Sequence, residues 1–112
     1  MAALDPVTKQ RLDSALLAVA KRVPLAAAYF FGSRAEGRGD RWSDYDVAVF
    51  IGGTEGWDLT DLAQFAAAVQ GEAGDDIELH AFPAAAWPTP HPASFAAYIL
   101  QHGVPLELPA AA

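Results

Sequence analysis

Apolar residues in the first part of the chain follow two different patterns, and each predicts a different element. One set recurs at helical spacing: Leu12, Ala15, Leu16, Val19 and Val23. Asp5 can cap such a helix and Pro6 suits its first position, so we expect a helix over 6–22 that Pro24 ends. The run LAAAYFF at 25–31 is continuously apolar, which is typical of a strand covered on both faces.

The rest of the chain continues this alternation of strands and helices. YDVAVFIGG at 45–53 predicts a strand closed by two glycines. Helical spacing then predicts a helix over 59–71, which Gly71 and Gly74 would stop. DDIELHAF at 75–82 alternates between polar and apolar residues, as in a strand with one covered face. A last helix is expected from about Phe95 to Gly103.

This order of elements predicts an α/β (α+β) fold with a small mixed β-sheet flanked by helices. The 112 residues are enough for one hydrophobic core and too few for two, so we expect a single domain over 1–112. With 53% hydrophobic and 19% charged residues, the chain has the composition of a globular protein.

Charge and cysteine content narrow the possible functions. A formal net charge of −7 argues against stable binding of nucleic-acid backbones, although a divalent cation could still hold a nucleotide on an acidic protein. The absence of cysteine excludes thiolate zinc sites and fits a reducing compartment. No apolar stretch approaches ~20 residues and no signal-like N-terminus is present, so we expect a cytoplasmic protein without a membrane partner.

The segment between the first two predicted strands, GSRAEGRGDRWSDYD, holds the candidate chemistry. Gly32 allows close approach of the backbone, and Ser33 and Arg34 can donate hydrogen bonds to a phosphate. Asp44 and Asp46 stand at the start of the next strand, and on one strand face their carboxylates could converge on one or two Mg²⁺ ions. Taken singly, these features also fit a plain turn and a capping turn. Together they predict a metal-dependent phosphate site.

The two motifs GSRA-x-G and SD-x-D, in this order, resemble the signature of the minimal nucleotidyltransferases of the DNA polymerase β-like superfamily. The resemblance implies a mixed sheet with flanking helices, and transfer of a nucleoside monophosphate from a nucleoside triphosphate such as ATP. It assigns two catalytic and metal-binding carboxylates, Asp44 and Asp46. It assigns five nucleotide-binding positions: Gly32, Ser33, Arg34, Gly37 and Ser43.

The family's third carboxylate is usually an aspartate inside a later strand, and here the matching triplet is Ile77-Glu78-Leu79. We therefore expect Glu78 to complete the catalytic and metal-binding set. The extra methylene of glutamate displaces the carboxylate, and Asp76, expected on the same face, could assist or substitute. His80 is expected to be a polar neighbour of Glu78 rather than a metal ligand.

The resemblance also implies a partner. Many members are cytoplasmic antitoxins encoded beside a helical HEPN-domain ribonuclease, which they neutralise by adenylylation. We therefore expect a Mg²⁺-dependent enzyme, with two ions, that transfers AMP from ATP to a HEPN toxin.

Two alternatives stay open. The chain could neutralise its partner by contact alone, for which Trp87, Phe95 and Tyr98 offer an apolar surface. It could instead modify a small molecule such as an aminoglycoside, although that activity usually requires an additional acceptor-binding domain.

Overall fold

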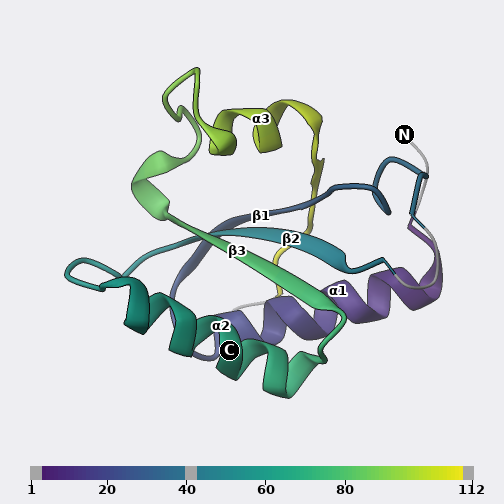
Figure 1. Ribbon diagram of the computed structural model, residues 1–112, viewed down its shortest axis with the longest axis horizontal. Coiled ribbons are helices and arrows are strands. Elements are labelled where there is room, and N and C mark those ends of the chain that lie inside the picture. The colour runs from purple at the N-terminus through teal and green to yellow at the C-terminus, as the bar shows by residue number, and fades with distance from the viewer. Residues whose placement is uncertain (1–3, 40–42, 110–112) are drawn as a thin grey trace.

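A computed structural model describes residues 4–39 and 43–109 of the chain. Helices and strands alternate along it as the sequence predicts (Figure 1). The elements are α1 (Pro6–Ala20), β1 (Leu25–Phe31), β2 (Tyr45–Ile51), α2 (Leu59–Ala73), β3 (Ile77–Pro83), the 3₁₀ turn η1 (Ala84–Ala86), α3 (Phe95–His102) and β4 (Val104–Pro105). None of these helices combines the length and the apolar character needed to cross a membrane.

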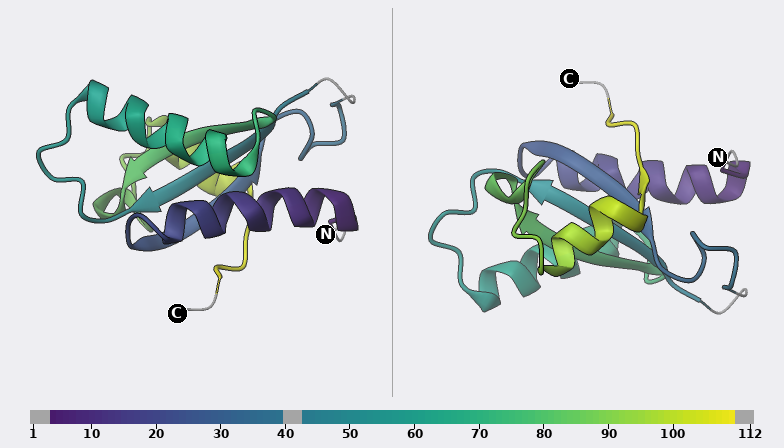
Figure 2. Two further views of the ribbon diagram at one scale, coloured as in Figure 1. Left: turned by 90° about the horizontal axis from the view of Figure 1, so that it is seen from below. Right: turned by 90° about the horizontal axis from the view of Figure 1, so that it is seen from above.

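The strands form one sheet in the order β3-β2-β1-β4. β1 runs antiparallel to both β2 and β4, whereas β2 and β3 are parallel, so the sheet is mixed. α1 and α2 cover one face of the sheet, and α3 lies across part of the other (Figure 2). The predicted fold class, a small mixed sheet flanked by helices, is confirmed.

The ends of the first two helices depend on local hydrogen bonds and on glycine. Asp5 caps α1 as predicted, because its carboxylate accepts from the Thr8 amide at 2.9 Å. α2 does not stop at Gly71 but continues to Ala73, since a single glycine inside a helix costs only about 1 kcal/mol. Gly74, with a φ of 122°, ends it instead.

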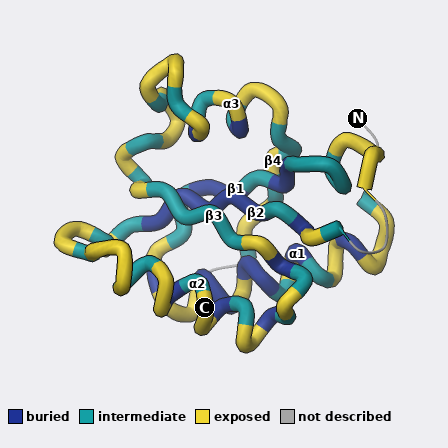
Figure 3. The backbone as a smooth tube through the Cα atoms, viewed as in Figure 1, coloured by how far each residue is buried: buried dark blue, intermediate teal, exposed yellow. Residues whose placement is uncertain are grey.

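β2 lies at the centre of the core because it is covered on both sides (Figure 3). Val47, Val49 and Ile51 pack against the layer of α1 and α2, and all three are essentially inaccessible to solvent. Ala48 and Phe50 point to the opposite face and pack beneath α3. The two-residue strand β4 was not predicted, because two residues are too few to show a period.

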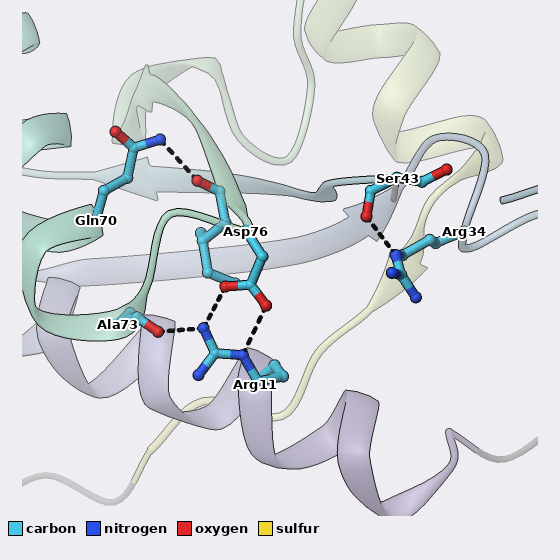
Figure 4. Close-up of polar contacts among 7 residues, drawn as sticks. Arg11, Arg34, Ser43, Gln70, Ala73 and Asp76 are labelled. Atoms are coloured by element: carbon cyan, nitrogen blue, oxygen red, sulfur yellow. Dashed lines mark hydrogen bonds and ion pairs between the residues drawn. The ribbon is translucent and has the colours of Figure 1, made fainter. Parts of the chain in front are cut away.

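An ion pair fixes the turn between α2 and β3 to α1. Arg11 donates from Nε to Asp76 Oδ2 at 2.9 Å, and its Nη2 contacts both Asp76 Oδ1 and the Ala73 carbonyl (Figure 4). This pairing lowers the pKa of Asp76 below its ordinary value, chiefly through the Arg11 hydrogen bonds. Gln70 Nε2 donates to the Ile77 carbonyl at 2.7 Å, so the first residue of β3 is also held.

We predict that Gly74→Ala destabilises the protein by about 1–3 kcal/mol, because a side chain at positive φ is strained. An added Cβ would also lie 2.1 Å from Arg11 Nη2 and disturb the Arg11–Asp76 pair. Gly71→Ala is the matched control: it has open space around it and should stabilise α2 by roughly 0.5–1 kcal/mol. Urea denaturation measures both changes. A Gly74→Ala protein as stable as the parent would show that this turn is not constrained as described.

Candidate active site

Three polar side chains from two parallel strands meet on the face of the sheet that α3 only partly covers. Asp46 comes from β2, and Glu78 and His80 come from β3. The register pairs Asp46 with Glu78 and Ala48 with His80, and alternate residues of a strand share a face. One ligand atom from each of the three side chains lies within 4.8 Å of the others, so all three can reach one ion.

His80 contacts both carboxylates. Its Nε2 lies 3.3 Å from Asp46 Oδ1 and 3.9 Å from Glu78 Oε2. The ring is held between two aromatic neighbours, with centroid distances of 4.9 Å to Phe31 and 5.9 Å to Phe95. The sequence placed His80 on the face of Glu78, but its spacing gave no sign of this contact with Asp46 across the strands.

Asp46 and Glu78 influence each other electrostatically. The pKa of Glu78 is raised, first because a protonated Glu78 can donate to Asp46, and then by partial burial and by the repulsion of the Asp46 charge. The nearby His80 opposes this shift. A divalent cation bound between these two carboxylates would offset their repulsion and so stabilise the folded protein.

Gly32 brings the turn after β1 directly against Asp46. Its φ is 86°, and a Cβ built there would lie 2.2 Å from Asp46 Oδ2, so only glycine fits. The following residues form hydrogen-bonded turns, with the Glu36 amide donating to the Gly32 carbonyl at 3.1 Å and the Arg38 amide to the Ser33 carbonyl at 2.8 Å. The segment after Gly32 is therefore a series of tight turns and not a helix.

Arg34 joins the two ends of the loop between β1 and β2. Its Nε donates to the Ser43 carbonyl at 2.6 Å (Figure 4). Its guanidinium carbon lies 4.2 Å from the centroid of the Tyr45 ring. The absence of a side chain at Gly39 is needed here, because a Cβ would lie 2.7 Å from Arg34 Cγ. Gly37 has a positive φ of 76° and open space around it. Contact of Arg34, Gly37 or Ser43 with a nucleotide stays a prediction.

Two other predicted carboxylates lie apart from this cluster. Asp44 is exposed and immediately precedes β2, and the three-residue cluster among the described residues does not include it. Its role as a metal ligand stays a prediction. The expectation that Asp76 shares the face of Glu78 is wrong: β3 begins only at Ile77, and the Asp76 carboxylate turns toward α1 and pairs with Arg11.

The donor set fits a divalent cation. Six ligands at about 2.1 Å from a central ion lie about 3.0 Å apart when adjacent and about 4.2 Å apart when opposite. The two distances from His80 Nε2 to the carboxylates, 3.3 and 3.9 Å, fall between these values. Two carboxylates also balance the charge of one divalent ion, and Gly32 leaves space for Asp46 in this position.

Comparisons with known proteins agree with this geometry. Residues 16–106 match the family model described as polymerase beta, nucleotidyltransferase, a range that includes Gly32, Asp46 and Glu78. A crystal structure from Sulfolobus solfataricus, provisionally described as a nucleotidyltransferase, is similar with a TM-score of 0.51 and 20% sequence identity. The similarity covers 76% of this chain and 79% of that one, and it supports the fold. Curated proteins give no significant match.

We predict that Glu78→Gln stabilises the metal-free protein at neutral pH by a few tenths to about 1 kcal/mol, because it removes a like charge beside Asp46. A carboxyl group with a raised folded-state pKa stabilises the fold only at low pH and loses that contribution as the pH rises. The difference between variant and parent should therefore vanish below about pH 4, the ordinary pKa range of glutamate.

Thermal unfolding in EDTA at several pH values measures the stability difference between parent and variant. The same measurement in Mn²⁺ at neutral pH gives the response of each protein to metal. The metal should stabilise the parent more than Glu78→Gln. Glu55→Gln changes an exposed glutamate outside the cluster. This control should have the same stability as the parent in EDTA and in Mn²⁺. An equal response of the parent and Glu78→Gln to pH and to metal would contradict the coupling of Glu78 with Asp46.

Proposed function

The chain belongs to the polymerase β nucleotidyltransferase family, and we propose that it transfers AMP from ATP to a protein acceptor in a Mg²⁺-dependent reaction. The observation that carries the proposal is the position of Asp46. Its carboxylate lies against Gly32 of the candidate phosphate turn and beside Glu78 and His80. A metal-binding carboxylate and a phosphate-binding turn would then act on the same triphosphate.

Members of this family typically use divalent metal ions, and the acidic cluster of this chain fits such an ion. When bound, Mg²⁺ would neutralise charge on the triphosphate and activate the attacking oxygen. Asp44, Asp46 and Glu78 are the proposed ligands, with a second ion expected at Asp44. The triphosphate itself is assigned to Gly32, Ser33 and the tight turns that follow them.

In the proposed reaction, a hydroxyl oxygen of the acceptor forms a bond with the α-phosphorus of ATP. The bond from that phosphorus to the oxygen bridging to the β-phosphate breaks, and pyrophosphate leaves. Glu78 is proposed to take the hydroxyl proton, because its carboxylate lies beside Asp46 at the cation site and borders the exposed aromatic surface where an acceptor would dock. Asp46 and the Gly32 turn orient the triphosphate, since positioning supplies much of the catalysis in such transfers.

The proposed acceptor is a HEPN-domain ribonuclease, which adenylylation would neutralise. Support comes from exposed aromatic side chains beside the acidic cluster. Phe95 packs on His80 with about half of its surface exposed, and Tyr98 stacks beside it with a similar exposure. Aromatic residues of this kind are enriched at protein interfaces. A partner bound there would hold its hydroxyl groups near Glu78.

A second candidate function is neutralisation by contact alone. The same aromatic surface favours it, together with Trp87, whose indole donates to the Tyr29 hydroxyl at 3.0 Å and remains partly exposed. Glutamate in place of the family's usual third aspartate also fits a weakened catalyst. Only the first function adds the mass of an AMP group to the partner.

We predict that the parent adds AMP to a HEPN-domain protein encoded beside it when ATP and Mg²⁺ are present, and that EDTA abolishes the reaction. Asp46→Asn should slow transfer at least about a hundredfold, because it removes a ligand that also positions the triphosphate. Asp75→Asn, an exposed change in the turn before β3, should transfer as the parent does. Intact-mass spectrometry of the partner follows the reaction.

Equal transfer by Asp46→Asn and the parent would contradict the site. Neutralisation of the ribonuclease without any mass gain would favour the contact-only function.

A further inference from the structure

We propose that His80 is a nitrogen ligand of the cation held by Asp46 and Glu78, and that it shifts the preference of this site from Mg²⁺ toward Mn²⁺. The inference rests on the proposed metal dependence of the site and adds a ligand beyond the three carboxylates assigned from the sequence. His80 is drawn into the cluster by the fold alone, because the parallel register of β2 and β3 places it next to Asp46.

The distances favour direct ligation. His80 Nε2 lies 3.3 Å from Asp46 Oδ1, close to the separation of about 3.0 Å between adjacent ligands of an octahedral ion. Its distance of 3.9 Å from Glu78 Oε2 also falls below the largest separation that two ligands of one ion can have, about 4.2 Å. Both distances are therefore compatible with one cation that contacts the imidazole and the two carboxylates.

The orientation of the ring is fixed before any ion binds. Phe31 and Phe95 meet the imidazole at steep interplanar angles of 64° and 76°, one from the sheet and one from α3. Ala48, the register partner of His80, is fully buried and small, which leaves room for the ring on this face. Because packing holds Nε2 toward the carboxylates, little side-chain freedom is lost when His80 ligates.

The chemistry of the donor decides which ion benefits. Mg²⁺ prefers oxygen ligands and keeps several water molecules, so replacing one of these waters by imidazole adds little to the affinity for Mg²⁺. Imidazole is a good ligand for first-row transition ions, and Mn²⁺ accepts both carboxylate and nitrogen donors. A site with two carboxylates and one imidazole should therefore bind Mn²⁺ more tightly than Mg²⁺.

A different role for His80 is a hydrogen bond to Asp46 that only orients the carboxylate. Loss of such a bond would lower the affinities for Mg²⁺ and Mn²⁺ by the same factor, because both ions bind Asp46. Loss of a ligand would weaken Mn²⁺ selectively. The ratio of the two affinities therefore separates a ligand from a positioning residue.

The test is calorimetric titration of the metal-free protein with MnCl₂ and with MgCl₂. The parent should bind Mn²⁺ at least about tenfold more tightly than Mg²⁺, and His80→Gln should reduce that ratio to about a third or less of its parent value. His102→Gln is the control, since this exposed histidine near the end of α3 lies outside the cluster. It should keep the parent's ratio. Thermal unfolding confirms that each variant is folded.

A second measurement needs no variant. Pulsed electron paramagnetic resonance of the Mn²⁺-loaded parent should show coupling to a ¹⁴N nucleus of the bound imidazole. Absence of ¹⁴N coupling, or an equal loss of Mn²⁺ and Mg²⁺ affinity in His80→Gln, would overturn the inference while leaving the proposed function intact. Failure of the parent to bind either ion would overturn the metal dependence itself.

Discussion

The register between the parallel strands β2 and β3 is the constraint on which the site depends. It places Asp46 directly opposite Glu78, two like charges that repel each other. The repulsion costs a few tenths to about 1 kcal/mol, whereas burial of a single valine side chain contributes about 1.5–3 kcal/mol. Val47 and Val49 are fully buried in this register, and a slip of β2 by one residue would turn the Asp46 carboxylate into the apolar layer beneath α1 and α2. The core therefore holds the carboxylates together without help from a metal.

Three contacts outside the β2–β3 ladder shape the site that this register creates. Gly32 lets the turn after β1 approach Asp46, so the candidate phosphate turn lies directly beside the candidate metal-binding carboxylate. Arg11 holds the carboxylate of Asp76 toward α1, directly before β3 begins. α3 then adds Phe95 beside His80, which borders the cluster with an aromatic surface. Each contact joins two different elements of the fold, and together they shape the surroundings of the candidate site.

The sequence predicted the elements well where the hydrophobic pattern was long. The apolar runs of β1 and β2 and the helical spacing of α1 and α2 were sufficient to place them. The alternation in β3 correctly put Glu78 on the face opposite Ile77. Asp76 was placed wrongly because alternation applies only inside a strand, whereas Asp76 precedes β3 and its carboxylate pairs with Arg11 of α1. The contact of His80 with Asp46 could not be predicted for a similar reason: it crosses between strands, and spacing within one strand cannot show it.

A crystal structure with Mn²⁺ and a non-hydrolysable ATP analogue would test the central claim most directly, because anomalous scattering locates manganese without ambiguity. The account predicts a manganese peak in contact with the carboxylates of Asp46 and Glu78, and a triphosphate lying against Gly32 and Ser33. A manganese ion bound elsewhere, or a triphosphate away from the turn after β1, would contradict it.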